Sequence, residues 1–333
     1  MSTKHTNLIV SSSPHVCDPV DTKTIMRDVV IALIPALAVS VYVFGIRALI
    51  MVAVCVAASV LFEAACRKLL NRPQTIGDWS AVVTGVILAF NLPVSLPYWM
   101  AVIGCFVAIV VVKQLFGGLG QNFANPAIVG RIVLFIAFAT PMTNWVVTDR
   151  MSSVIREAAG ADAVTGATPL GLLNKGIEVP VKDMALGLIN GSLGEVSALC
   201  LLIGGAYLLW RKVISWQTPV SYIATVAVLT LLFPKAGSGV EWMLYSVFGG
   251  GLMLGAIFMA TDYATSPVTG KGQLIYGIGC GVFTVFIRYF GSYNEGVCYS
   301  IMVMNLFVAL IDKYVKPTRF GVVKSNEKEA AKK

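Results

Sequence analysis

The chain has 333 residues, of which 57% are hydrophobic and only 13% are charged, and its formal net charge is +8 at pH 7. Soluble domains carry about 25% charged residues, so this composition excludes an ordinary soluble enzyme and indicates an integral membrane protein. The excess of Lys and Arg does not require a nucleic-acid partner, and none is expected, because membrane proteins collect these residues in cytoplasmic loops.

The seven cysteines and two histidines form no metal-binding pattern. The cysteines are scattered, none belongs to a C-x-x-C pair, and most lie within apolar runs, as is typical of small core residues. His5 and His15 both lie in the polar N-terminal stretch. We therefore expect no iron–sulfur, zinc or haem site, and no signal peptide, because no cleavage site follows a short apolar core.

In chain order, residues 1–24 are predicted to form a cytoplasmic tail, and 25–139 a first group of five hydrophobic segments. These lie at about 25–44, 48–66, 79–90, 98–112 and 127–139. A long polar interval, 140–195, separates this group from a second one in 196–311. The second group has segments at about 196–210, 219–233, 242–260, 272–287 and 297–311. A charged cytoplasmic tail, 312–333, follows.

This pattern predicts an all-α membrane protein with about ten transmembrane helices, arranged as two inverted five-helix repeats. Several segments are shorter than the about 20 apolar residues that a straight span requires. Gly, Pro and Asn interrupt the pattern near 91–93, 117–126 and 261–272, so broken or re-entrant helices are expected. Matching interruptions in two repeats suggest a ligand site between them, although ordinary caps and turns also explain each one singly.

The basic residues predict the orientation. If ten segments alternate from a cytoplasmic N-terminus, 18 of the 25 Lys and Arg residues fall on the inner side and 7 on the outer side. This bias agrees with the positive-inside rule. Both termini are therefore expected in the cytoplasm of a bacterial cell, with the polar interval outside the cytoplasmic membrane.

Within the polar interval, residues 162–169 could support chemistry at a hydroxyl group. Small residues precede Thr168, so a large partner can reach it, and Pro169 biases Thr168 toward an extended backbone. Asp162 lies six residues upstream, close enough to act as a base or a metal ligand at that hydroxyl. A bare stretch of this composition is also typical of a surface turn.

The spacing Asp162-x-x-Thr165-Gly166-Ala167-Thr168 resembles the D-x-x-[ST]-G-A-[ST] signature of proteins to which a flavin transferase attaches FMN, taken from FAD, through a phosphoester. Together with 114–127 and 258–267, it resembles the family that contains the D subunit of the Rnf electron-transport complex and, more distantly, the B subunit of the sodium-translocating NADH:quinone reductase. The similarity covers about 24–320. It implies that Thr168 carries covalent FMN and that Asp162, Thr165, Gly166 and Ala167 complete the motif.

The resemblance also implies a non-covalent riboflavin in the membrane domain, to which Asn122 and Asn125 could donate amide hydrogen bonds. It implies partners in the other subunits of an Rnf complex, including a second FMN-carrying subunit and iron–sulfur subunits. Ferredoxin and NAD would bind to those subunits, since this chain has no Gly-rich turn of a βαβ unit. The chain would thus work as part of a translocase and not be catalytic alone.

Three acidic residues near the hydrophobic segments, Glu63, Asp262 and Asp312, are candidates for an ion path, because acids at membrane depth are functional candidates by default. All three fall near the predicted cytoplasmic boundary, where ordinary boundary charges explain them too. Glu63 also lies four residues before Arg67, a spacing that allows a local helix pair. The sequence leaves open whether the translocated ion is Na⁺ or H⁺.

The sequence therefore predicts a flavin-carrying subunit that passes electrons across the membrane, coupled to ion translocation. The alternative is a solute channel or transporter built from the same inverted repeats, because a fold does not determine a function. The flavinylation motif favours the first interpretation, since a channel has no use for it.

Overall fold

The computed structural model describes residues 20–160, 165–173, 176–195, 197–235, 237–291 and 296–316. Its first half contains α1 (Thr22–Phe44), α2 (Ile46–Leu69), η1 (Ile76–Asp78), α3 (Ser80–Phe90), α4 (Tyr98–Phe106), the π-helical η2 (Val107–Gln114) and α5 (Pro126–Ala137). The second half contains α10 (Ala198–Trp210), α11 (Gln217–Leu232), α12 (Gly239–Phe248), α13 (Leu252–Leu254), the π-helical η4 (Gly255–Met259), α14 (Gly270–Phe290) and α15 (Val297–Tyr314). All ten predicted hydrophobic segments fall on these helices.

Length and hydropathy separate the helices into two sets. Four helices of the described chain, α1, α2, α14 and α15, are long and apolar enough to cross a membrane. The pair formed by α12 with α13 and η4, bent by 58°, makes a fifth if it counts as one span. Shorter apolar helices accompany them: α3, α4 with η2, α5, α10 and α11. The predicted helical membrane protein is confirmed at this level, and the count of ten spans stays a prediction.

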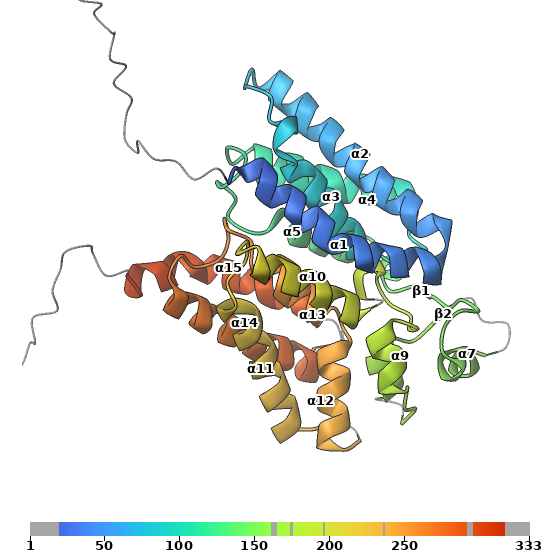
Figure 1. Cartoon of the computed structure of the whole chain (residues 1–333). Helices are drawn as coiled ribbons and strands as arrows, with labels where there is room; N and C mark the ends of the chain where they lie inside the picture. The colour runs from blue at the N-terminus through green and yellow to red at the C-terminus, as the bar shows by residue number, and fades with distance from the viewer. Residues whose placement is uncertain are drawn as a thin grey trace, which may run out of the picture.

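The helices of the two halves form two packed groups that meet along α1 and α10 (Figure 1). Asp28 of α1 holds this contact together. Its buried carboxylate accepts hydrogen bonds from Arg211 Nε at 3.0 Å and from the Tyr207 hydroxyl at 3.2 Å, both on α10 or directly after it. The start of α1 and the end of α15 lie at one end of the molecule, and β1, β2 and α7 lie at the other (Figure 1).

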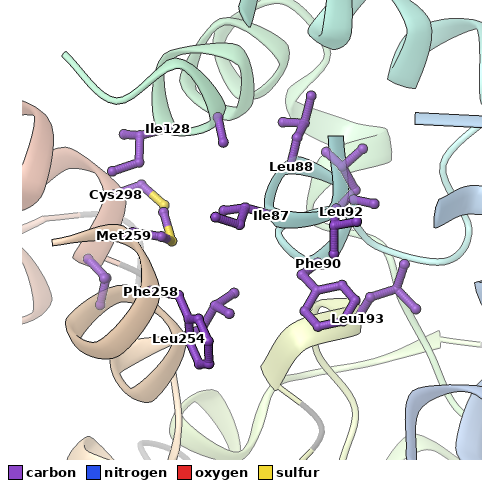
Figure 2. Close-up of a cluster of buried hydrophobic side chains, with 14 of the residues drawn as sticks. Ile87, Leu88, Phe90, Leu92, Ile128, Leu193, Leu254, Phe258, Met259 and Cys298 are labelled. Atoms are coloured by element: carbon purple, nitrogen blue, oxygen red, sulfur yellow. The ribbon is translucent and has the colours of Figure 1, made fainter. Parts of the chain in front are cut away.

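Two helix breaks meet in the centre of the molecule. The first follows α3, and the second lies between α12 and α13, where Gly250 and Gly251 adopt φ angles of +65° and +69° that favour glycine. Figure 2 shows the apolar side chains that fill the space between the breaks: Ile87, Leu88, Phe90, Leu92, Ile128, Leu193, Leu254, Phe258, Met259 and Cys298. The interruption predicted near 91–93 is therefore a real break, and those predicted near 117–126 and 261–272 correspond to the non-helical segments between η2 and α5 and between η4 and α14. The break at 249–251 was not predicted, because it falls inside the predicted segment 242–260.

The polar interval is folded, which its sequence did not indicate. It contains α6 (Ala139–Met142), β1 (Trp145–Val146), α7 (Ser153–Ala159), β2 (Thr165–Gly166), α8 (Pro169–Leu173), α9 (Val181–Leu186) and η3 (Leu193–Glu195). We call the described residues between 139 and 190 the cap. The two-residue strands pair antiparallel, so the expectation of a purely helical chain misses this small sheet.

A second hydrophobic cluster attaches the cap to the bundle. Its cap members share burial against α12 and are Ile155, Leu170, Leu172, Leu173, Val179, Met184 and Ile189. Trp242 and Tyr245 of α12 complete the cluster, and the Tyr245 hydroxyl donates to the Val179 carbonyl. The cap is therefore held in place by α12. The sequence of α12 alone did not indicate that this short helix binds the cap.

Candidate functional site

The described part of the flavinylation motif lies in the cap and has a fixed backbone. Gly166 pairs with β1, and a Cβ atom at Gly166 would lie only 3.1 Å from Val147 Cγ2 and 3.3 Å from Ala159 Cβ. Next to it, the Ala167 carbonyl accepts a hydrogen bond from Nδ2 of buried Asn190 at 2.8 Å. Close packing at Gly166 thus explains why the position before Ala167 carries no side chain.

Thr168 directly precedes α8 and is half-buried. Its carbonyl accepts from Leu172 N at 2.9 Å, the first hydrogen bond of the helix, and Pro169 occupies the first helical position, where a missing N–H costs nothing. Buried Leu170 and Leu172 anchor the helix in the cap cluster. The structure therefore holds Thr168 at the start of a packed helix. Asp162 and the side chain of Thr165 lie outside the described residues.

A polar hollow lies beside the motif, between β1 and α7. Charged residues that line it are Asp149, Arg156 and Glu157, and Val147 forms part of its apolar wall. Because Val147 also contacts Gly166, the hollow borders the motif backbone. This arrangement provides a polar surface on which a flexible ligand attached nearby could rest.

A pocket lies at the opposite end of the molecule, where the two halves meet. Its cavity volume is about 90 Å³, and it opens to the surface. Its walls come from the starts of α1 and α3, the end of η2, the start of α5, and the ends of α10 and η4. Three predicted residues line it: Asn122 and Asn125 from the interruption near 117–126, and Asp262 from the one near 261–272.

The two asparagines of this pocket differ in what they are free to bind. Asn122 Oδ1 is buried and has no hydrogen-bond partner among the described residues. Asn125 instead caps α5, accepting from Ala127 N at 3.0 Å, and its Nδ2 donates to the Met259 carbonyl at 3.2 Å. Asn122 is thus the better placed of the two to bind a ligand, while Asn125 joins the two halves.

Glu63 is fully buried and forms an ion pair with Lys113, a pocket residue, at 2.9 Å. The Lys113 ammonium also donates to Ser80 Oγ at 2.6 Å, and Glu63 Oε1 accepts from the Thr75 hydroxyl at 2.7 Å. The local pair with Arg67 does not form, since Glu63 reaches across to η2. Glu63 is therefore not a surface charge, and only its partner Lys113 lines the pocket.

The other two acidic candidates lie around the segment that joins η4 to α14. Asp262 is half-buried, lines the pocket and accepts from the Thr265 hydroxyl at 3.1 Å. Burial raises the pKa of the Asp262 carboxyl, and hydrogen bonds from the Thr265 hydroxyl and the Ala264 N–H oppose that shift. Asp312 of α15 accepts from Val268 N at 3.2 Å and is not part of the pocket lining.

Several basic residues that the charge count assigns to the inner or outer side are buried. Arg131 donates to Asn91 Oδ1 at 3.0 Å in the centre of the molecule, and Arg288 donates to the carbonyls around the break after α12. Lys113 and Arg131 therefore leave the inner count of basic residues, and Arg288 leaves the outer count. The excess of basic residues on the inner side persists. Glu195 is also buried, and sequence reasoning missed it. Its position directly before a hydrophobic segment was the available signal.

A family model described as the NQR2, RnfD, RnfE family matches residues 9–321. The chain belongs to this family. The predicted resemblance, and with it the predicted role as a subunit of an Rnf-type complex, is therefore confirmed.

Members of this family are similar over nearly the whole chain. The D subunit of the Na⁺-translocating ferredoxin:NAD⁺ oxidoreductase complex of Acetobacterium woodii is 48% identical over 98% of this chain and 99% of its own length. The D subunit of the proton-translocating ferredoxin:NAD⁺ oxidoreductase complex of Clostridium ljungdahlii is 44% identical over 94% and 96%. The D subunit of the ion-translocating oxidoreductase complex of Actinobacillus succinogenes is 35% identical over 94% and 97%. Relatives of either ion specificity thus match this chain end to end.

The buried ion pair leads to a stability prediction. Glu63→Leu should lower the free energy of unfolding by about 3–5 kcal/mol, because it leaves the Lys113 ammonium buried without a counter-charge. A double variant, Glu63→Leu with Lys113→Met, should regain most of that loss. Thermal unfolding in detergent measures the stability of both variants. The control is Glu157→Gln, at an exposed residue of α7, whose free energy of unfolding should stay within about 0.5 kcal/mol of the parent. A single variant as stable as the parent would contradict the assigned pair.

Proposed function

We propose that this chain is the flavin-carrying membrane subunit of an ion-translocating ferredoxin:NAD⁺ oxidoreductase complex, with FMN attached to Thr168. The single observation that carries the proposal is the sequence motif 162–168, whose described residues lie in the cap, with Thr168 half-buried directly before α8. The similarity to the subunits from Acetobacterium woodii and Clostridium ljungdahlii supports the same kind of complex. When bound, a flavin supplies the electron-transfer chemistry, while the protein binds and orients it.

The attachment reaction needs only a reachable hydroxyl and a donor. A flavin transferase would move FMN from FAD to Thr168: the Thr168 oxygen forms a bond to the FMN phosphorus, the pyrophosphate bond of FAD breaks, and AMP leaves. Gly166 and Ala167 pack against the rest of the cap, so that enzyme would approach Thr168 from its exposed side. Asp162, at its spacing in the motif, would assist as a base or a metal ligand.

The pocket at the far end is the proposed site of a second flavin, a non-covalent riboflavin. Its mixed apolar and amide lining suits a flat ring with a polar edge. The unpartnered Oδ1 of Asn122 is an acceptor that an imide N–H of such a ring could satisfy. The apolar cluster between the helix breaks (Figure 2) would separate this site from the FMN and exclude water from the space between them.

The proposed topology has ten crossings in two inverted repeats, with both termini in the cytoplasm and the cap outside. Contacts at the helix ends support it. The end of α1 meets the cap, where Arg150 and Thr148 donate to the Tyr42 and Val43 carbonyls. The start of α1 meets the end of α10, where Asp28 pairs with Arg211. The pocket thus lies at the proposed cytoplasmic end and the motif at the outer end.

Electrons would enter and leave through partners. The proposed partners are the other subunits of the complex, including a second FMN-carrying subunit and iron–sulfur subunits, with ferredoxin and NAD bound by those subunits. The membrane would be the bacterial cytoplasmic membrane. Glu63, Asp262 and Asp312 remain proposed elements of an ion path at the cytoplasmic end, with Glu63 acting through its pair with Lys113.

The attachment site is tested by Thr168→Ala, which should abolish covalent flavin, and by Thr168→Ser, which should keep it because only the hydroxyl is required. The measurement is in-gel flavin fluorescence together with the mass of the peptide that contains the motif. Thr143→Ala, at an exposed threonine of the same end, is the control. Covalent flavin in Thr168→Ala would rule out this residue, and its absence from the parent would favour the channel interpretation.

The second flavin is tested in a Thr168→Ala background, where any remaining flavin is released by denaturation. Asn122→Ala should weaken its binding by about five- to hundred-fold, the effect of losing one buried hydrogen bond. Asn125→Ala should mainly lower stability, by about 0.5–2 kcal/mol, because it removes the cap of α5. Equal flavin content in the Asn122 variant and the parent would exclude that residue from the site.

The orientation is tested with single cysteines in a Cys-depleted variant. Ser153→Cys, exposed on α7 of the cap, should react with an impermeant maleimide added to intact cells. Gln74→Cys, exposed after α2, should react only after the cells are opened. The reverse pattern would overturn the proposed sidedness.

A further inference from the structure

Glu195 is a buried carboxylate that the proposed flavin sites do not use. It ends η3, between the cap and α10, and only 7% of its surface is exposed. Its Oε2 accepts one long hydrogen bond from Ser192 N, at 3.3 Å, and its Oε1 has no partner among the residues that the structure describes. No basic side chain of the described ranges lies within ion-pair distance of it, so nothing in that part of the chain offsets its charge directly.

Such a carboxylate must be protonated or hold a cation, because an isolated buried charge is very costly. The neighbouring oxygen atoms favour the cation. Within the described chain, the Oγ of Ser192, a residue that is 1% exposed, has no partner, and neither has Oδ1 of Asn190 in the same segment. A proton on Glu195 could donate to only one of these acceptors, whereas a hard cation binds several oxygen ligands at once.

The local backbone brings Ser192 and Glu195 onto one face. Glu195 N donates to the Ser192 carbonyl at 3.0 Å, which closes the 3₁₀ turn, and side chains three residues apart eclipse each other in such a turn. Two glycines, Gly191 and Gly251, lie so close to the Glu195 carboxylate that a side chain at either position would collide with it. A Cβ atom at Gly191 would lie 2.6 Å from Oε2, and one at Gly251 would lie 2.8 Å from Oε1.

The surroundings suit an ion that binds and leaves. Arg288 approaches the neighbouring Gly250, donating to the Gly249 and Gly250 carbonyls on the other side of the helix break. Its positive charge keeps the affinity for a cation moderate, as an ion path requires. Ion sites of transporters are also found where helices are discontinuous, and Glu195 faces such a break.

We propose that Glu195 and Ser192 form a monovalent-cation site, for which Na⁺ is the probe. The site lies towards the end of the molecule that carries the motif, between the cap and the central apolar cluster of Figure 2. Asn190 links it to the cap by donating to the Ala167 carbonyl, and Leu193 N links it to the cluster by donating to the Leu92 carbonyl. The inference rests on the proposed ion-translocating role and is independent of both flavins.

The experiment measures thermal unfolding of the purified full chain in NaCl against choline chloride at equal ionic strength, followed by ²²Na⁺ binding. A ligand that binds the folded state raises the unfolding temperature in a saturable way. Na⁺ should do so for the parent and for Glu157→Gln, whose carboxylate is exposed on α7. Glu195→Gln should bind Na⁺ at least about tenfold more weakly, and Ser192→Ala about fivefold more weakly.

Two results would overturn the site. The first is a Glu195→Gln variant whose unfolding temperature responds to Na⁺ as that of the parent does. If that variant does not fold, an undiminished Na⁺ response of Ser192→Ala would also overturn the site. The other is a parent stabilised by acid but indifferent to Na⁺, which means that Glu195 is simply protonated. Covalent FMN is assayed in the same samples. Loss of the Na⁺ response with FMN intact would concern only the cation site, and loss of FMN with the Na⁺ response intact would concern only the flavin attachment.

Discussion

The structure depends on how its two helix breaks satisfy backbone hydrogen bonds in an apolar bundle. A helix meets this requirement internally, and any interruption at membrane depth leaves carbonyl and N–H groups that protein must satisfy. After α3, the Asn91 amide donates to the Ile87 carbonyl, and Leu193 N donates to the Leu92 carbonyl. After α12, the Arg288 guanidinium binds the Ser246, Gly249 and Gly250 carbonyls. Polar side chains are therefore buried where the chain must turn.

The functional regions lie around these breaks because broken helices place polar groups next to space. Towards one end, the pocket forms between the two halves, with Lys113 and Glu63 as a buried pair behind its wall. Towards the other end, Glu195 faces the glycines of the second break. The apolar cluster of Figure 2 separates the two regions. A bundle of unbroken helices would offer neither a pocket of this kind nor a buried carboxylate with free oxygen atoms.

The cap connects the flavinylation motif to this framework. Its apolar residues are few and scattered, and they are buried in one cluster together with Trp242 and Tyr245 of α12. Asn190 then ties the motif backbone to the segment that leads into η3. The position of Thr168 thus depends on the second half of the chain, although the motif follows the first. A flavin attached there would be held relative to the bundle and not on a free loop.

From the sequence alone, the membrane class, the positions of the ten hydrophobic segments and the family could be predicted, and the motif 162–168 could be located. These properties are local: they follow from hydropathy, from breaks at Gly, Pro and Asn, and from a seven-residue spacing. Tertiary structure decided what each charge does. Lys113 and Arg131 were counted as charges of the cytoplasmic side, and a pair of Glu63 with Arg67 was allowed, because spacing along one helix cannot show a partner on another. Burial of Glu195, the fold of the cap and the different roles of Asn122 and Asn125 likewise arise only where distant segments pack together.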